Sequence, residues 1–132
     1  MKRIKIIIER SKDLYSAYAE NVEGIYGSGD TVAEAKKSVL DAIRLLKKYN
    51  SEDHIPKEIK GKYELVFKFD AESLLNYYKG VFSNAAFERI TGINQKQIQH
   101  YSTGLKRPRP IQAKKIETAL HKLGAELMSV EL

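Results

Sequence analysis

The chain has 132 residues, 42% of them hydrophobic and 30% charged, with a net charge of +6; this indicates one ordinary globular domain or two small ones and argues against disorder. It contains no cysteine, which excludes disulfides and thiolate metal sites, and its three histidines are too far apart in sequence to form a metal-site motif. No apolar run approaches the length of a membrane span, and the opening MKRIKIII leads straight into charged residues, unlike a signal peptide, so we expect a cytoplasmic protein with no membrane partner.

The first part of the chain predicts an α+β domain over residues 1–69. Four segments have the alternation or the β-branched run that is typical of strands, and they are Lys2–Glu9, Tyr15–Ala19, Ile25–Ser28 and Tyr63–Phe69. Thr31 and Glu34 have the spacing of a capping box, which starts a helix that should end near Tyr49–Asn50. Apolar residues recur along this helix at Val32, Ala35, Val39, Ile43 and Leu46. The expected order is β-β-β-α-β, with one helix covering one side of one sheet.

The second part, residues 70–132, predicts a small all-α domain. Asp70 can cap a helix over Ala71–Lys79 that stops at Gly80, and Ser83 or Asn84 can cap a second over Ala85–Thr91. Gly92 breaks the chain before a third helix that begins at Asn94, has Gln97 at the capping-box spacing and stops by Gly104. Pro110 lies in the first turn of a last helix whose apolar stripe is Ala113, Ile116, Leu120, Leu123 and Leu127. That stripe either packs within its own domain or forms a dimer surface.

The charge of the second part is concentrated in one segment. Between Glu88 and Glu117 the chain has no acid, yet it has seven bases, namely Arg89, Lys96, Lys106, Arg107, Arg109, Lys114 and Lys115. A carboxylate there would repel a phosphate backbone, whereas each base adds a salt-dependent contribution to nucleic-acid binding. The alternative is a solvated basic surface on a helical bundle, which is what a charge run alone usually indicates.

Helix, glycine turn and helix is the pattern of a helix-turn-helix, with Phe87, Gly92, Ile93, Ile98 and Tyr101 at its core and turn positions. If Ile98 and Tyr101 point inward, a helix of about 3.6 residues per turn points the polar residues beside them outward. These residues, which are suited to base edges in a major groove, are Gln95, Lys96, Gln99, His100 and Thr103. Lys106, Arg107 and Arg109 follow the helix end, where we expect them to contact phosphates.

Two stretches of the chain resemble known families. FERITGINQKQIQHYSTGLKRPRP resembles the helix-turn-helix of Xre/Cro-like repressors, with Glu88 where that family usually has a small residue. YSAYAENVEGIYGSGDTVAEAKKSVLDAI is similar to the HicB antitoxin motif, in which a tyrosine-bearing strand precedes a GxxxxGDT loop and a helix. Together the two resemblances cover most of the chain apart from the 50–62 loop.

The resemblance implies an antitoxin with a partial RNase H-like N-terminal domain that blocks a HicA-type, mRNA-cleaving toxin. It also implies that the C-terminal domain binds operator DNA as a homodimer or higher homo-oligomer and represses the operon of the antitoxin. The toxin-facing candidates, around the glycine loop, are Tyr18, Glu20, Glu23, Tyr26 and Asp30. Alternatively Asp30 only caps the helix and Tyr18 belongs to the core, while the glycines are more readily explained as backbone requirements.

We expect a binding protein without cofactor or metal and without catalytic activity. RNase H-like catalysis needs carboxylates gathered around metal ions, and the opening strand has Glu9 only at its very end. Neither a Ser/His/Asp nor a Cys/His arrangement is visible in the sequence. The alternative function is an Xre-like transcriptional repressor whose N-terminal domain senses a small ligand or another partner.

Overall fold

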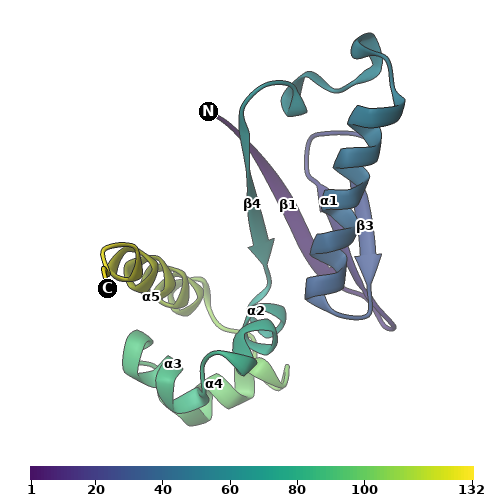
Figure 1. Ribbon diagram of the computed structural model, residues 1–132. Helices are drawn as coiled ribbons and strands as arrows, with labels where there is room; N and C mark the ends of the chain where they lie inside the picture. The colour runs from purple at the N-terminus through teal and green to yellow at the C-terminus, as the bar shows by residue number, and fades with distance from the viewer. The chain divides into compact units, whose positions relative to one another are not determined.

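The computed structural model describes residues 1–132 and has an α+β fold with a four-stranded mixed sheet and five α-helices (Figure 1). The strands are β1 (Lys2–Arg10), β2 (Tyr15–Ala19), β3 (Tyr26–Gly29) and β4 (Tyr63–Phe69), in the spatial order β3-β2-β1-β4. β1 pairs antiparallel with β2 and parallel with β4, because the chain crosses over through α1 (Val32–Tyr49) before it returns as β4. The four predicted strands are confirmed to within one residue at each end.

Alternation along β1 decides which face of the sheet is covered. Ile4, Ile6 and Ile8 are buried, while the residues between them point to the opposite face, as the two-residue period of a strand requires. Val39 and Ile43 of α1 are buried as well, and α1 packs along β2 and β3. The predicted layer of one helix on one face of one sheet is confirmed.

Two glycines of β3 let α1 approach the sheet closely. A Cβ atom on Gly27 would lie 2.5 Å from the backbone nitrogen of Val39, and one on Gly29 would lie 2.4 Å from the Cβ of Glu34. Neither glycine has a positive φ angle, so close packing and not backbone conformation excludes a side chain there. Gly24, in the loop between β2 and β3, has a φ of 84° and is the position that needs the left-handed conformation.

The start of α1 differs in detail from a standard capping box. The Thr31 hydroxyl accepts a hydrogen bond from the Glu34 amide at 3.1 Å, as predicted. The Glu34 carboxylate, however, accepts from the amide of Asp30 at 2.9 Å, one residue before the cap. Thr31 and not Asp30 is therefore the capping residue, and the explanation of Asp30 as a helix cap is wrong.

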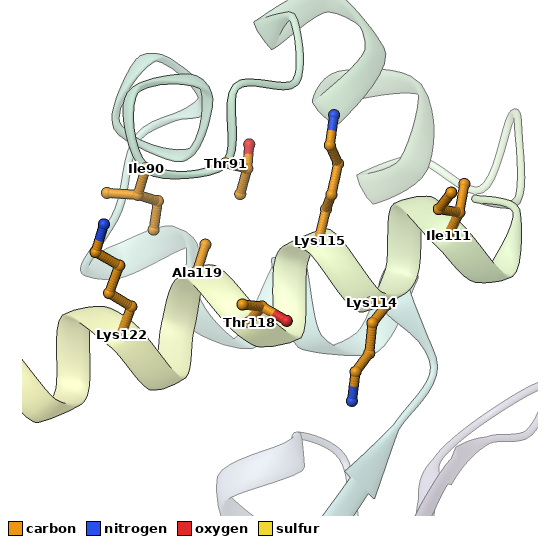
Figure 2. Close-up of a pocket in the computed structure, with 8 residues that line it drawn as sticks. All are labelled: Ile90, Thr91, Ile111, Lys114, Lys115, Thr118, Ala119 and Lys122. Carbon is orange, nitrogen blue, oxygen red and sulfur yellow. The ribbon is translucent and has the colours of Figure 1, made fainter.

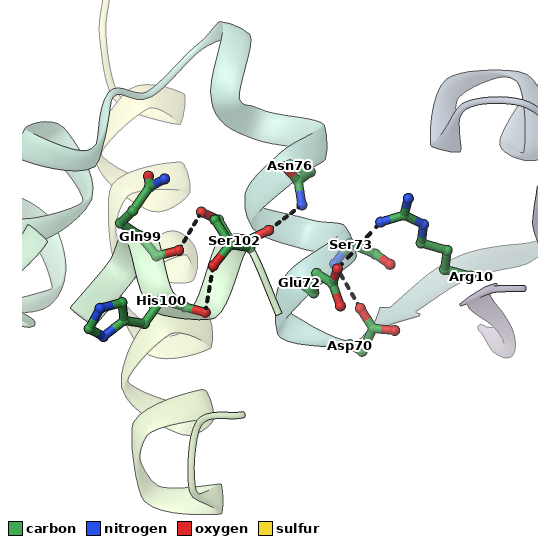
Figure 3. A network of polar contacts seen from close by, with 9 residues as sticks. Arg10, Asp70, Glu72, Ser73, Asn76, Gln99, His100 and Ser102 are labelled. Atoms are coloured by element: carbon green, nitrogen blue, oxygen red, sulfur yellow. Dashed lines mark hydrogen bonds and ion pairs between the residues drawn. The ribbon is translucent and has the colours of Figure 1, made fainter. Parts of the chain in front are cut away.

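The second half contains α2 (Ala71–Tyr77), α3 (Asn84–Thr91), α4 (Gln95–Ser102) and α5 (Pro110–Met128). The chain divides into two compact units, Met1–Ser73 and Leu74–Leu132, with the division inside α2. Asp70 caps α2 as predicted, since its carboxylate accepts from the Ser73 amide at 2.7 Å (Figure 3). α2 is shorter than predicted because Tyr78–Gly80 tightens into a 3₁₀ turn.

The second unit has a core of its own around α3 and α4. Its buried members come from all four helices and the α3–α4 turn, and they are Leu75, Phe87, Ile93, Ile98, Tyr101 and Ile116. The inward positions predicted for Phe87, Ile93, Ile98 and Tyr101 are confirmed. Leu120 packs partly against this core, whereas Leu127, in the same stripe of α5, remains 61% exposed. No helix of the chain is both long and apolar enough to cross a membrane.

Candidate functional site

The turn between α3 and α4 is held by four hydrogen bonds. Gly92 is left-handed, with φ 76°, and its amide donates to the Glu88 carbonyl at 2.8 Å. The Ile93 amide donates to the Thr91 hydroxyl at 3.0 Å, and the Asn94 side chain accepts from the Lys96 amide at 2.8 Å. The Glu88 carboxylate accepts from the Gln95 amide at 2.9 Å. The acid that departs from the repressor pattern therefore satisfies an amide in the first turn of α4, a position that favours negative charge.

The predicted capping box at the start of α4 is wrong in one respect. Asn94 is the cap, but the Gln97 side chain does not return to it. Its amide nitrogen instead donates to the Tyr101 hydroxyl at 3.0 Å, one turn further along the helix. This bond gives a partner to the hydroxyl of a tyrosine whose ring is buried in the core. A buried hydroxyl without a partner costs more free energy than an exposed backbone amide that water can solvate.

α4 turns a polar face outward. Four of the five predicted base-reading residues are exposed, and they are Gln95, Lys96, Gln99 and Thr103. His100 is only partly exposed, and its Nδ1 atom is buried without a hydrogen-bond partner. His100 is therefore the least accessible of the set.

Neighbouring side chains fix the orientation of this face. The Asn84 side chain, at the start of α3, donates to the Oε1 atom of Gln99 at 2.7 Å. The Asn76 side chain of α2 donates to the Ser102 carbonyl at 2.7 Å, and the Ser102 hydroxyl donates to the Gln99 carbonyl at 3.0 Å (Figure 3). These bonds tie the last turn of α4 to the other helices. Sequence patterns indicate Asn84 only as an alternative to Ser83 for the helix cap, which Ser83 provides, and do not indicate Asn76, because contacts between helices have no local spacing rule.

The loop after α4 presents the predicted phosphate-contacting bases. Lys106, Arg107 and Arg109 are all exposed and form no salt bridge. The Lys106 amide donates to the His100 carbonyl at 3.2 Å, which anchors the loop to the last turn of α4. Of the seven bases in the acid-free segment only Lys114 is paired, with Glu117 at 3.2 Å. The segment thus carries unneutralised positive charge on a well-packed scaffold, an arrangement that suits a polyanion.

A second set of predicted residues lies on the open face of the sheet, opposite α1. Tyr18 of β2 stands across from Tyr26 of β3 and from Ile7 of β1, and Tyr26 is 59% exposed. The Glu20 carboxylate reaches to 3.8 Å from the amine of Lys5 on the same face. Three of the five toxin-facing candidates, Tyr18, Glu20 and Tyr26, therefore share one surface.

A shallow groove of about 430 Å³ runs along this face. Its lining residues are Ile7, Ile8, Glu9, Tyr18, Glu20, Lys68, Phe69 and Asp70, three acids to one base. The Tyr18 hydroxyl donates to the Glu9 carboxylate at 3.0 Å, and this hydrogen bond raises the pKa of Tyr18 above its ordinary value, with partial desolvation and the charges of Glu9 and Glu20 acting in the same direction. The sequence indicates Glu9 only as a possible catalytic acid, although its place two residues from Ile7 in an alternating strand puts it on this face.

The other two toxin-facing candidates lie elsewhere. Glu23 is exposed in the loop between β2 and β3. Asp30 is exposed at the far end of β3, where its backbone amide bonds to the Glu34 carboxylate. The structure places neither Glu23 nor Asp30 among the residues that line the groove beside Tyr18.

No group of three or more His, Cys, Asp or Glu side chains has the arrangement of a metal site. Comparison of the chain with protein-family models, with curated proteins and with solved structures finds no match in any of the three.

Proposed function

We propose that the second unit binds double-stranded DNA, with α3 and α4 as a helix-turn-helix and α4 as the helix that enters the major groove. The observation that carries this proposal is the division of α4 into two faces. Ile98 and Tyr101 are buried, whereas Gln95, Lys96, Gln99 and Thr103 are exposed, and the one neighbouring acid, Glu88, accepts a hydrogen bond from the Gln95 amide. Amide and ammonium groups in this position can hydrogen-bond with base edges.

Within this site, the basic side chains of the loop and the polar side chains of α4 would have different functions. Lys106, Arg107 and Arg109 supply charge without base discrimination, because phosphates are the same at every position of a duplex. Gln99, held by Asn84, supplies discrimination, because a fixed amide can distinguish donors from acceptors. Such a unit gains affinity by reading two half-sites as a dimer, and the binding site would then be a nearly palindromic operator.

We infer further that the first unit binds a basic protein on the open face of its sheet, and that the whole chain is a HicB-type antitoxin. Tyrosines on a rigid sheet are frequent anchors of protein interfaces, and the groove beside Tyr18 has an excess of acids. A toxin that cleaves mRNA must have a positively charged RNA-binding surface, and carboxylates complement it. On this proposal the chain acts by binding and does not catalyse a reaction.

The proposal is tested by separating the two activities. Lys106→Ala, Arg107→Ala and Arg109→Ala are combined in one chain, and DNA from upstream of its own coding sequence is the probe in a mobility-shift assay. We expect the variant to lose operator binding and to protect cells from the toxin encoded beside it as well as the parent chain does. If both activities fall together in a folded variant, the assignment of one task to each unit is wrong.

The reciprocal variant completes the test. Tyr18→Ala with Tyr26→Ala removes two rings from the open face without changing the charge of the chain. We expect this variant to lose co-purification with the toxin and to retain the DNA shift. A chain that neither shifts its upstream DNA nor binds a toxin, but changes its melting temperature with a small metabolite, would favour the ligand-sensing repressor instead.

A further inference from the structure

A second groove, of about 390 Å³, lies in the second unit between the end of α3 and the outer side of α5 (Figure 2). Ile90, Ile111 and Ala119 form its apolar part, and Ile111 is 74% exposed. Lys115 and Lys122 extend along it toward α3. An apolar floor with ammonium groups at its edge suits a segment that is both apolar and acidic. None of the lining residues is among those that we propose contact the nucleotide base edges, namely Gln95, Lys96, Gln99 and Thr103.

The last residues of the sequence are both apolar and acidic, and therefore complement this groove. The segment 126–132, ELMSVEL, contains two acids and no base. Its four large apolar side chains are exposed, namely Leu127 at 61%, Met128 at 88%, Val130 at 64% and Leu132. Four exposed apolar side chains within six consecutive positions are more than the scattered single ones that a solvated surface normally has. We call this stretch the C-terminal segment.

The charges of α5 are arranged against the dipole of the helix. Arg109 precedes its first turn and Lys114 and Lys115 lie in its second, although the start of a helix favours negative charge. Glu126 lies in the last turn, which favours positive charge and has no base. Stabilisation of the helix itself therefore does not explain this distribution. Two such helices placed side by side in opposite directions would bring each acidic end to a basic beginning.

The C-terminal segment cannot cover the Ile111 end of the groove in its own chain. Ile111 and Leu127 belong to one continuous helix and are separated along it by about 24 Å, at about 1.5 Å per residue. Five residues of the segment follow Leu127, and even fully extended they span at most about 18 Å. A second copy of the chain has no such restriction.

We propose that the C-terminal segment of a second copy occupies the α3–α5 groove, and that two copies exchange their segments reciprocally in a two-fold symmetric dimer. The groove extends from Ile111 to Lys122, about 17 Å along α5, a length that seven residues can span. Apolar side chains of the segment cover Ile90 and Ile111, while Glu126 and Glu131 pair with Lys115 and Lys122. The proposal does not rest on DNA binding or on the toxin.

The first test is the oligomeric state of the full chain, measured by sedimentation velocity over a range of concentrations. We expect a dimer for the parent chain. Met128→Ser, Val130→Ser and Leu132→Ser in one chain should weaken dimerisation by at least about a hundredfold, because apolar burial is lost twice per dimer. Val81→Ser with Leu105→Ser is the matched control, since these exposed apolar residues lie outside both groove and segment. The control should leave the dimer unchanged.

A charge exchange tests the pairing itself. Lys115→Glu with Lys122→Glu should weaken the dimer, and adding Glu126→Lys with Glu131→Lys in the same chain should restore it. Circular dichroism confirms that each variant is folded, which is expected because all four side chains are exposed. A chain that is monomeric throughout, a dimer that the segment variant leaves intact, or a charge exchange that fails to restore association would each overturn the proposal.

The absence of native cysteine allows a direct test of proximity. Ile111→Cys and Val130→Cys are prepared as separate proteins and mixed under mild oxidation. We expect the disulfide between the two different chains to exceed the statistical mixture, in which it already forms about twice as often as either disulfide between identical chains. A statistical mixture of the three products would mean that the segment does not occupy the groove.

Discussion

Removal of the loop bases Lys106, Arg107 and Arg109 should change the salt dependence of DNA binding by a defined amount. Each phosphate contact contributes about 0.9 to the slope of log K against log salt, so the three together contribute about 2.7 per chain. Between a 1 M reference and about 0.15 M salt, that slope corresponds to about 150-fold in affinity, or about 3 kcal/mol. The bases form no salt bridge in the free chain, so their removal breaks no internal ion pair.

The assay is fluorescence anisotropy of a labelled duplex, carried out at several salt concentrations with the parent chain and the triple alanine variant. A control variant, Lys12→Ala, Lys37→Ala and Lys62→Ala, removes three exposed bases of the first unit and lowers the net charge from +6 to the same +3. We expect the slope to fall only for the loop variant. An equal fall in both variants would mean that net charge and not a located site attracts DNA, and an unchanged slope would refute the phosphate contacts.

Three further predictions follow from individual contacts. Gly27→Ala should lower the free energy of unfolding by about 2–3 kcal/mol, measured by urea denaturation, because the added methyl group meets the backbone of α1 at 2.5 Å; wild-type stability would mean that α1 does not lie so close. Asn84→Ala should reduce discrimination between operator and unrelated DNA but leave the slope of log K against log salt unchanged, because it frees the Gln99 side chain without removing charge. Competition titrations at several salt concentrations would measure both quantities. A changed slope would contradict the prediction. Glu9→Gln should lower the pKa of Tyr18 toward its ordinary value, because a neutral amide stabilises the protonated phenol less than a carboxylate does. A pH titration of phenolate absorbance, with Tyr18→Phe as the reference, would detect the shift. An unchanged pKa would exclude that hydrogen bond in solution.

Local patterns predicted most of the secondary structure. Alternation in the strands and capping residues such as Thr31, Asp70 and Asn94 depend on neighbours within a few residues, and these predictions are confirmed. The errors have a common physical origin. Gln97 donates to the hydroxyl of the buried Tyr101, and Glu34 accepts from the amide of the residue before the cap. In both cases the side chain bonds to a nearby polar group other than the one that the capping box predicts.

The candidate sites could be predicted only in part. The outward face of α4 follows from helical periodicity once Ile98 is placed inward, so the sequence alone identified its residues. The support that Asn84 gives to Gln99 depends on how two helices cross, and no local spacing encodes that. For the same reason the grouping of Tyr18 with Tyr26 required the strand register, which also separated Asp30 from them.

The distribution of acids links the two surfaces of the second unit. That unit has four carboxylates, and two of them are engaged in the fold, since Glu88 accepts from Gln95 and Glu117 pairs with Lys114. The remaining two lie in the C-terminal segment, residues 126–132. The length of α5 keeps this segment away from the loop bases of its own chain, since Arg109 and Glu126 lie about 25 Å apart along the helix, at about 1.5 Å per residue. Its proposed position in the groove of a second copy holds two helix-turn-helix units together, and two half-sites are bound more tightly than one, so variants that release the segment should weaken DNA binding even though they leave every base in place.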